Sequence, residues 1–337
     1  MKKIYIKTTE ACNLHCKHCY VGDNRRKKDF FDEIKTINWL KGRIGEGKDC
    51  LISFHGGEPF LCDLNKMAKI CDSFPAAEFD ATSNLCFSSD EYINKLISFI
   101  KKYFIRNSTD RPFVKTSWDH KIRFATESEE ETWKKNIKKL LSEGIDVKVI
   151  TCLTKDFITN ITPEAYRTYM MDLGIKELDF ERLTANSTPD KTLLPDYEAV
   201  DQWLLSFYEC NTDFEVGMFA NMSAAACGTF VDCRARKCMQ NTITINADGT
   251  IGGCPNSSIH EWFCNIDGKI NHQMHKQLIQ KECVRNPQCY TCDLFMVCNG
   301  DCHQLSWQGN TCPEPKRLLR RIINDVERGK TTLVFNA

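Results

Sequence analysis

Three cysteines near the start of the chain have the spacing of a metal-binding loop. Cys12, Cys16 and Cys19 form a C-x3-C-x2-C motif directly after a strand-like run. Three thiolates spaced in this way can bind one face of a cubane iron–sulfur cluster, and they leave the fourth iron without a protein ligand. An iron with an open position is a site for a substrate. The alternative is a zinc site, which would need a fourth ligand such as His15 or His18.

A second set of cysteines lies in the last third of the chain. The chain has 20 cysteines and no secretion signal, so disulfides are not expected to account for them. The regularly spaced ones are Cys233, Cys238, Cys254, Cys289, Cys292, Cys298, Cys302 and Cys312. The surrounding segment is too poor in apolar residues to fold alone, so we expect metal binding to be part of its folding. The alternative here is a zinc ribbon made from the segments CYTC and CNGDC.

Both cysteine patterns resemble those of the radical S-adenosylmethionine (SAM) superfamily. The segment CNLHCKHCY is similar to the signature of that superfamily, and Tyr20 matches its aromatic residue after the third cysteine. The later cysteines, with Gly249 between Cys238 and Cys254, are similar to the SPASM extension of many of its members. The resemblance implies that SAM chelates the open iron of a [4Fe-4S] cluster. It also implies that one electron from the cluster cleaves SAM to a 5′-deoxyadenosyl radical.

The resemblance to the SPASM extension implies two auxiliary [4Fe-4S] clusters with interleaved ligands. The first cluster would be bound by Cys233, Cys238, Cys254 and Cys302. The second cluster would be bound by Cys289, Cys292, Cys298 and Cys312. The pattern leaves the eighth ligand open, because Cys227 or Cys283 lies near enough in the sequence to replace Cys233.

Further residues are expected to contact SAM because they match motifs of the same superfamily. The segment SFHGGEPF is similar to the GGEP motif, whose turn holds the amino group of SAM. The matching residues are Gly56, Gly57, Glu58 and Pro59. Glycine lets a backbone approach a ligand closely. The segment TSWDH is similar to the Ser-x-Asp segment of the fourth strand, so Ser117 and Arg123 are expected at the carboxylate or ribose of SAM.

The residues that could take part in chemistry directly follow predicted strands. Hydrophobic patterns predict strands at residues 2–9, 50–59, 77–84, 113–119, 146–153 and 175–183. Helical segments alternate with them, which predicts an α/β fold with a partial (β/α)6 barrel of parallel strands. In such barrels, the active-site residues lie at the C-terminal ends of the strands. Glu181 and Arg182 end the sixth strand and are candidates for catalysis or substrate contact, with an ion pair at the barrel rim as the alternative.

The remaining elements and the domain division follow from local patterns. Ser128 and Glu131 predict a capping box for a helix over 128–143, and the pair Asp248-Gly249 predicts the turn of a hairpin. We expect a barrel over residues 1–230, a small cysteine-rich metal-cluster domain over 231–315, and a C-terminal helix and tail over 316–337.

The net charge and the hydropathy of the chain limit the classes of binding partner that we expect. The 337 residues include 45 Lys and Arg against 45 Asp and Glu, so the net charge does not favour nucleic acid or an anionic membrane surface. No segment approaches the ~18 uninterrupted apolar residues of a membrane span, and no signal peptide is present. We therefore expect a cytoplasmic protein. The resemblance also implies an electron donor such as flavodoxin or ferredoxin.

Enzymes that share these motifs mostly modify a peptide or protein side chain, and maturation of a ribosomal peptide is the favoured reaction. In sulfatase-maturing relatives, a carboxylate after the cysteine of the G-x4-C element acts as a base, whereas Pro255 stands here. The alternatives are sulfatase maturation, small-molecule dehydrogenation and a non-catalytic metal-binding interaction module. Because the chain begins at its first barrel strand, leader recognition is expected to use a separate protein or another surface.

Overall fold

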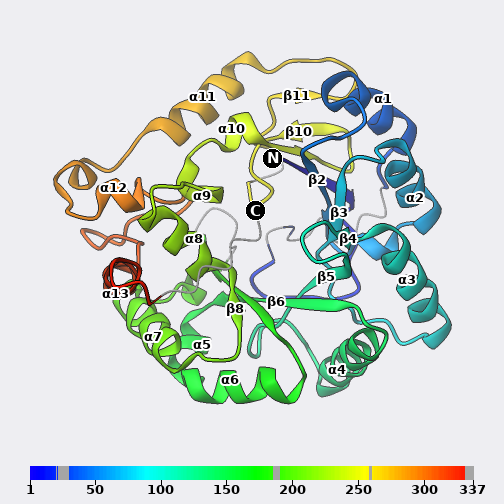
Figure 1. Ribbon diagram of the computed structural model, residues 1–337. Helices are drawn as coiled ribbons and strands as arrows, with labels where there is room; N and C mark the ends of the chain where they lie inside the picture. The colour runs from blue at the N-terminus through cyan, green and yellow to red at the C-terminus, as the bar shows by residue number, and fades with distance from the viewer. Residues whose placement is uncertain (20, 22–29, 185–189, 258–259, 331–337) are drawn as a thin grey trace.

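The computed structural model describes residues 1–19, 21, 30–184, 190–257 and 260–330. Figure 1 shows the arrangement: strands curl around a central space, and helices surround them on the outside. The described segments form two sheets, one of six strands and one of five.

The first sheet contains the start of the chain and part of the cysteine-rich region. Its order is β11-β10-β9-β1-β2-β3. The bounds are β1 (Lys2–Thr9), β2 (Cys50–Gly56), β3 (Glu78–Ala81), β9 (Thr242–Ile245), β10 (Thr250–Gly252) and β11 (Cys264–Asn265). Strands β1, β2 and β3 are parallel neighbours. On its other side β1 pairs in parallel with β9, so a strand of the cysteine-rich segment extends the barrel sheet.

The second sheet continues the barrel. Its order is β4-β5-β6-β7-β8, with bounds β4 (Ile105–Arg106), β5 (Arg111–Ser117), β6 (Asp146–Leu153), β7 (Glu177–Arg182) and β8 (Glu215–Val216). Strands β5 to β8 are parallel. A parallel bridge between Thr82 and Lys115 joins β3 to β5. The six predicted strands are therefore β1, β2, β3, β5, β6 and β7, and the predicted partial barrel is confirmed.

Helices cover the outer face of the barrel (Figure 1). They are α1 (Glu33–Ile44), α2 (Leu64–Ser73), α3 (Asp90–Tyr103), α4 (Glu127–Ser142), α5 (Lys155–Asn160), α6 (Pro163–Asp172), α7 (Tyr197–Cys210) and α8 (Gly217–Ala226), with a short 3-10 helix η2 (Pro59–Leu61) after β2 and another, η3 (Lys191–Leu193), before α7. Ile4, Ile6, Ile52 and Phe54 of β1 and β2 are fully buried in the core that these helices complete. This apolar layer is what fixes the strands in place.

The inner face of the barrel is polar. Successive side chains of a strand point to opposite faces, so the residues between the core positions of β1 and β2 point inward. The Tyr5 and His55 rings are 5.9 Å apart there. Lys115 Nζ and Asp80 Oδ2 form an ion pair of 2.5 Å. The register places Cys152 directly beside Glu181 on neighbouring strands, so both belong to this inner face.

Helix α4 begins at a different capping box from the predicted one. Thr126 Oγ1 accepts a hydrogen bond from the Glu129 N–H at 3.3 Å, and Glu129 Oε2 accepts one from the Thr126 N–H at 3.4 Å. The prediction that Ser128 and Glu131 form this box was wrong. The segment TESEEE contains two overlapping S/T-x-x-E patterns, and the first is used because Thr126 is the last residue with extended backbone.

The cysteine-rich region has short elements. They are α9 (Asp232–Ala235), α10 (Cys238–Asn241), α11 (His272–Cys283), η4 (Pro287–Thr291) and α12 (Phe295–Cys298), followed by the C-terminal α13 (Lys316–Glu327). The predicted hairpin is formed by β9 and β10, and Gly249 in its turn has a φ of +82°. Helix α13 packs on α7 and α8 and buries Leu318, Leu319 and Ile322. The division at residue 231 stays a prediction.

In the part of the chain that the structure describes, none of the helices has both the length and the apolar character needed to cross a bilayer.

Candidate functional site

The three-cysteine loop after β1 is attached by its backbone to the GGEP turn after β2. The Gly57 N–H donates to Thr9 O, and the Glu58 N–H donates to Ala11 O, each at 2.8 Å. A Cβ on Gly57 would lie 2.3 Å from the carbonyl oxygen of Ala11, and one on Gly56, whose φ is +132°, would lie 2.1 Å from that of Thr9. Both glycines are therefore required by the close approach of the chain that leads into the cysteine loop.

Glu58 connects the GGEP turn to the end of β3. Its Oε1 accepts hydrogen bonds from the Phe60 N–H at 3.0 Å and the Ser83 hydroxyl at 2.9 Å, and its Oε2 accepts one from the Asn84 N–H at 2.6 Å. Burial raises the pKa of Glu58 to about 7, although these hydrogen bonds oppose the shift. The carboxylate therefore accepts these hydrogen bonds from groups of the protein itself, and they fix the shape of the turn.

Asn84 is a residue of the site that the sequence reasoning did not single out. Its Nδ2 donates to Asn13 Oδ1 at 2.7 Å and to Cys12 Sγ at 3.5 Å, and its Oδ1 accepts from the Cys86 N–H at 2.8 Å. Asn13 returns a hydrogen bond to the Cys86 carbonyl at 2.6 Å. The end of β3 therefore holds the first cysteine in place. The segment TSN, a loose match to the Thr-Asn-Gly turn of the superfamily, was the available signal.

The three N-terminal thiols fit the predicted cluster. Cys12, Cys16 and Cys19 are thiols outside any disulfide and are partly exposed, and they are close enough for the charges of Cys16 and Cys19 to act on Cys12. A converging set of three soft sulfur ligands, open to one side, suits an iron–sulfur cluster with one iron left free. His18, one of two possible fourth ligands for zinc, lies instead with Nε2 3.4 Å from Asp119.

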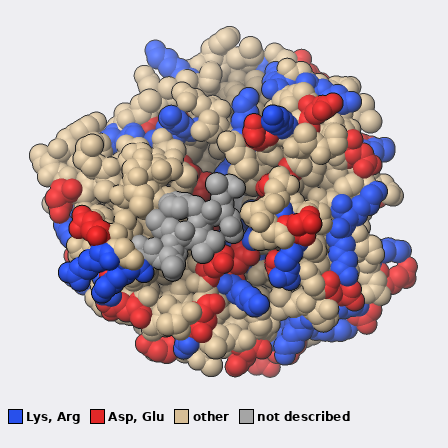
Figure 2. Space-filling model, in the orientation of Figure 1, with Lys and Arg blue, Asp and Glu red and all other residues tan. Residues whose placement is uncertain are grey.

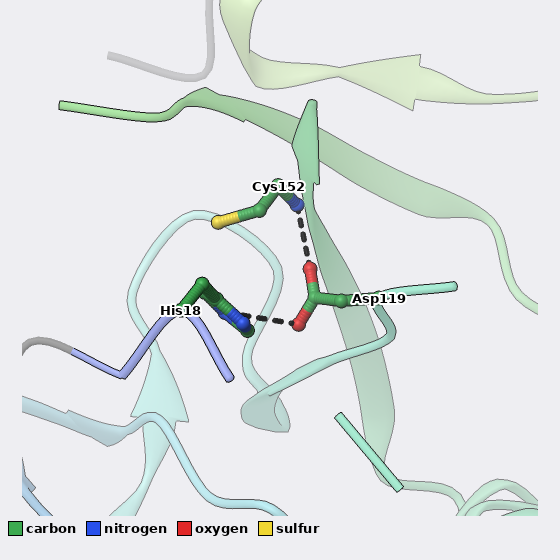
Figure 3. Close-up of side chains that lie close together, drawn as sticks. All are labelled: His18, Asp119 and Cys152. Atoms are coloured by element: carbon green, nitrogen blue, oxygen red, sulfur yellow. Dashed lines mark hydrogen bonds and ion pairs between the residues drawn. The ribbon is translucent and has the colours of Figure 1, made fainter. Parts of the chain in front are cut away.

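Asp119 links the cysteine loop to two barrel strands (Figure 3). Its Oδ1 accepts from the Cys152 N–H on β6 at 2.7 Å, and its Oδ2 lies near His18 and accepts from Arg123 Nε at 2.6 Å. The ligand atoms of His18, Asp119 and Cys152 all lie within 4.8 Å of one another. Since the carboxylate is already paired with Arg123, we interpret this group as a structural connection rather than as a metal site.

Arg123 is a half-buried cation beside the cysteine loop. Burial lowers its pKa, but the charges of Asp119 and Cys16 outweigh burial and raise the pKa above its usual value. The Cys16 thiol donates to the Arg123 carbonyl at 3.6 Å, and the Lys17 N–H donates to Ile122 O at 2.8 Å. The segment after β5 and the cysteine loop are therefore joined at several points, and Arg123 stays charged at their junction.

The other predicted SAM contacts lie in the same area or outside the described residues. Pro59 is buried at the start of η2, and its carbonyl accepts a hydrogen bond from Thr8 Oγ1 at 3.0 Å. Ser117 is buried at the C-terminal end of β5. Tyr20 lies outside the described residues. The roles of these residues toward SAM stay predictions.

The two candidates at the end of β7 have different surroundings. The Glu181 carboxylate accepts a hydrogen bond from Asn256 Nδ2 and lies near Cys152 and Cys254. Burial raises the pKa of Glu181 to about 7. Arg182 forms an ion pair with Asp301. The inner face of the barrel therefore carries Glu181, whereas Arg182 joins the barrel rim to the cysteine-rich segment.

Arg182 belongs to a buried network of charges. Its Nη1 donates to Pro313 O at 3.1 Å and lies 3.8 Å from Glu314 Oε2. Arg234 Nη2 pairs with Glu314 Oε1 at 2.7 Å. Buried ion pairs of this kind cost desolvation energy and are costly to break. Arg182 therefore forms the kind of ion pair at the barrel rim that the sequence offered as the alternative to a catalytic role.

The first auxiliary cysteine group comes together as the resemblance implied. Each of the four sulfurs lies close enough to the other three for their charges to interact, and the members are Cys233, Cys238, Cys254 and Cys302. Within this group, the interaction between Cys233 and Cys302 is the strongest for each of these two thiols. All three candidates for the eighth ligand, Cys227, Cys233 and Cys283, are exposed, but Cys233 lies close to the other three sulfurs of the group. The geometry favours Cys233 as the eighth ligand.

The second auxiliary group lines a cavity of about 340 Å³. The four predicted ligands all contribute to its wall, and they are Cys289, Cys292, Cys298 and Cys312. Cys302 of the first group lines the cavity as well, and a cavity with this set of soft sulfur ligands suits an iron–sulfur cluster. Arg236 and Arg285 line the same cavity and place positive charge beside the thiols.

Comparisons with known proteins agree with the fold. No model of a known protein family matches the chain. The uncharacterized protein MJ0907 of Methanocaldococcus jannaschii is 25% identical over 217 residues, which cover 60% of this chain and 70% of that protein.

Solved structures with the same fold include two that carry ligands. Native anSMEcpe with bound AdoMet has a TM-score of 0.75 at 15% identity, over 96% of this chain and 99% of that one. Streptococcus suis SuiB bound to precursor peptide SuiA has a TM-score of 0.60 at 15% identity, over 89% of this chain and 71% of that one. The chain therefore has the fold of these proteins, and the fold predicted from its resemblance to the radical SAM superfamily is confirmed.

Proposed function

We propose that the protein is a radical SAM enzyme that oxidises a side chain of a ribosomally made peptide. The observation that carries this proposal is the convergence of the three-cysteine loop, the GGEP turn and Arg123 at the C-terminal ends of β1, β2 and β5. Two separate groups of four cysteines accompany this convergence.

We assign cluster binding, SAM binding and positioning of the site to different residues of the chain. A [4Fe-4S] cluster bound by Cys12, Cys16 and Cys19 would, with SAM, supply the radical that removes a hydrogen atom from the substrate. Arg123 is a charged, half-buried guanidinium, and we assign it to the carboxylate of SAM. Gly57 and Glu58 fix the GGEP turn to the cysteine loop, so the two halves of the SAM site keep a constant spacing.

Glu181 is our candidate for the proton acceptor. An oxidation that starts with loss of a hydrogen atom must also remove one electron and, in most cases, one proton. Glu181 faces the barrel interior beside Cys152, and a carboxylate with a pKa of about 7 suits proton transfer near neutral pH. The eight later cysteines would hold the groups that take the electron.

The position of Glu181 also keeps sulfatase maturation as a second candidate. Pro255 follows Cys254 where sulfatase-maturing relatives are expected to have a carboxylate. Here Asn256 donates to the Glu181 carboxylate, so β7 places a carboxylate near Cys254. The missing acidic residue at position 255 is therefore a weaker argument against that reaction than it is from the sequence alone.

A peptide substrate is supported by ligands in proteins of the same fold. SuiB has been solved with its precursor peptide SuiA, and anSMEcpe has been solved with AdoMet and a Cp18Cys peptide at a TM-score of 0.73 and 14% identity. We extend this to the present chain as part of the proposal, together with a cytoplasmic location and a flavodoxin- or ferredoxin-type electron donor.

Anaerobic reconstitution tests the proposal. The protein should bind about three cubane clusters, from three plus eight ligands, and form 5′-deoxyadenosine from SAM when dithionite is added. A variant with Ala at Cys12, Cys16 and Cys19 is the control, and it should retain the auxiliary clusters but form no 5′-deoxyadenosine. A fully loaded wild-type protein that leaves SAM intact would contradict the proposal.

A further inference from the structure

Arg236 lies in the loop between two predicted ligands of the first auxiliary group, and its backbone is unusual. It follows α9 and precedes Cys238, the first residue of α10, by two positions. Its φ is +51° and its ψ is +41°, the left-handed conformation that residues other than glycine rarely adopt. Backbone outliers of this kind persist where the surrounding structure imposes them, and they gather at functional sites. The loop therefore holds Arg236 in a conformation that an arginine does not prefer.

The guanidinium of Arg236 is buried, and only part of it is hydrogen-bonded. The residue is 9% exposed. Its Nη2 donates to the carbonyl oxygen of Val284 at 2.8 Å, whereas Nε and Nη1 are buried without a hydrogen-bond partner among the residues that the structure describes. Figure 2 shows the usual arrangement, in which Lys and Arg side chains lie on the surface among Asp and Glu. A buried cation with unused donors is costly unless a further group accepts from them.

The carboxylates near Arg236 are engaged elsewhere. Glu282 accepts hydrogen bonds from two backbone N–H groups at the start of α10, and Asp301 forms an ion pair with Arg182. Burial and the like charge of Arg285 lower the pKa of Arg236, although a guanidinium stays charged. The acids of this region therefore do not supply the acceptors that Nε and Nη1 of Arg236 lack.

Sulfur atoms of the first auxiliary group lie beside Arg236. The residue is close enough to Cys302 and Cys238 for its charge to act with those of both thiols. Arg236 also lines the cavity of the second group, so it stands between the two groups. Hydrogen bonds to the sulfurs of an iron–sulfur cluster are one of the factors that set its reduction potential. The unpaired donors of Arg236 therefore have suitable acceptors in a cluster bound at the first group.

We propose that Arg236 donates hydrogen bonds to sulfur of the first auxiliary cluster and raises the reduction potential of that cluster. The inference rests on the proposed function, because it assumes a cluster at the first auxiliary group. A guanidinium stabilises the reduced cluster, which carries one more negative charge than the oxidised one. Cys254 of the same group lies near Glu181, so a raised potential favours this cluster as the acceptor of the electron that leaves the substrate.

Removal of the charge tests the inference in protein that carries only the auxiliary clusters. The parent is the full chain in which the three N-terminal cysteines are changed to Ala, reconstituted anaerobically. Potentials are measured by titration with dithionite, followed by electron paramagnetic resonance. Arg236→Met removes the charge and the donors, and Arg236→Lys keeps the charge but loses the planar set of donors. Arg320→Met is the matched control, because Arg320 is half exposed and paired with Asp293 at 3.0 Å.

The expected result is a change in potential without a change in iron content. All four proteins should hold about eight iron atoms per chain. In Arg236→Met, one of the two auxiliary signals should be about tenfold harder to reduce, which is a potential lower by about 59 mV. Arg236→Lys should lower the potential by less, and Arg320→Met should leave it unchanged.

Two results would overturn the inference. One is an unchanged potential in fully loaded Arg236→Met, which would leave the proposed function in place. The other is loss of iron from both Arg236 variants, because Arg236 would then serve assembly of the cluster and not its potential. If instead the parent binds zinc, or no iron, at the auxiliary groups, the auxiliary clusters of the proposed function fail and the inference fails with them.

Discussion

Glu181 and Arg182 are adjacent in the sequence but have unrelated surroundings. The strand alternation of β7 places Glu181 beside Cys152 on the inner face and leaves Arg182 to pair with Asp301. Composition and spacing treat the two residues alike, and only the register of β7 separates them. Of the two candidates, Glu181 is the one whose position suits catalysis.

The substitution Glu181→Gln should separate radical formation from product formation. We expect 5′-deoxyadenosine to form at close to the wild-type rate with dithionite, because Arg123 and the three-cysteine loop are unchanged. Modified peptide should fall by about 100-fold, the usual contribution of a general base. Both products are measured in one reaction by liquid chromatography and mass spectrometry. Equal losses of both would show that Glu181 acts elsewhere.

The pH profile of the same reaction gives an independent test. Since burial raises the pKa of Glu181 to about 7, the ionised base is scarce below that pH and dominant above it. Wild-type product formation should therefore rise as the pH increases from about 6 to about 8. The rise should be absent in Glu181→Gln, because an amide does not ionise in that range.

At the residue level, the sequence pointed to the cysteines that are candidate cluster ligands but not to the residues that hold them in place. The resemblance carried by the cysteine spacings implied two auxiliary groups, and the structure brings the first four cysteines together and places the other four around one cavity; their role as cluster ligands stays a prediction. Asn84 and Asp119 were not identified as site residues, although they hold Cys12 and His18. Their roles depend on contacts between β3, β5 and the cysteine loop, and such contacts leave no local pattern.

At the level of elements, the GGEP turn positions the cysteine loop. From the sequence, we expected the two glycines of this turn to let a ligand approach closely. In the structure, it is the protein's own backbone that lies close to them. Gly56 and Gly57 lie against the carbonyls of Thr9, Glu10 and Ala11. The turn after β2 and the loop after β1 therefore form one rigid unit.

The substitution Gly57→Ala should break this unit, whereas Gly42→Ala should not. A Cβ at position 57 would meet two carbonyl oxygens at 2.3 Å, and one at position 42 would meet nothing within 4 Å. We expect Gly57→Ala to lower the free energy of unfolding by about 1–3 kcal/mol and to abolish SAM binding. Gly42→Ala lies in α1 and should raise it by about 0.5–1 kcal/mol.

Denaturant unfolding and calorimetric titration with SAM measure both effects. Retained SAM affinity in Gly57→Ala would show that the cysteine loop can move away from the turn without loss of the site.

The elements themselves were predictable where the pattern is local. All six barrel strands were found from their apolar runs, and the predicted hairpin is formed by β9 and β10. The capping box was misplaced by two residues because TESEEE offers two equivalent starts. The pairing of β9 with β1 was not predicted, since no local signal links strands so far apart in the sequence.

On the scale of the whole molecule, the first auxiliary group ties distant segments together. Cys233 lies in α9, Cys238 in α10, Cys254 after β10 and Cys302 after α12. The network of Arg182, Arg234, Asp301 and Glu314 crosses the same region. Metal binding there should therefore stabilise the contact between the barrel and the cysteine-rich segment as well as the segment itself.

The substitution Cys233→Ser should remove one cluster of three, and Cys227→Ser should remove none. Cys233 lies close to the other three sulfurs of its group, whereas Cys227 is the residue at the C-terminal cap of α8. Iron should fall from about twelve to about eight atoms per chain in the first variant and stay constant in the second. Iron and sulfide analysis with electron paramagnetic resonance measures this. A full complement in Cys233→Ser would assign the eighth ligand to another residue.

The pairing of β1 with β9 has a consequence for biosynthesis. β1 and β2 are both made before Thr242–Ile245, so the second edge of β1 lacks its partner β9 until that segment has been made. An unpaired strand edge is a template for wrong association. Because β9 lies between Cys238 and Cys254, the strand that closes this edge arrives together with the ligands of the first auxiliary group. The strand that completes this sheet and three of the four cysteines of the group are therefore made within one short stretch of the chain, residues 233–254.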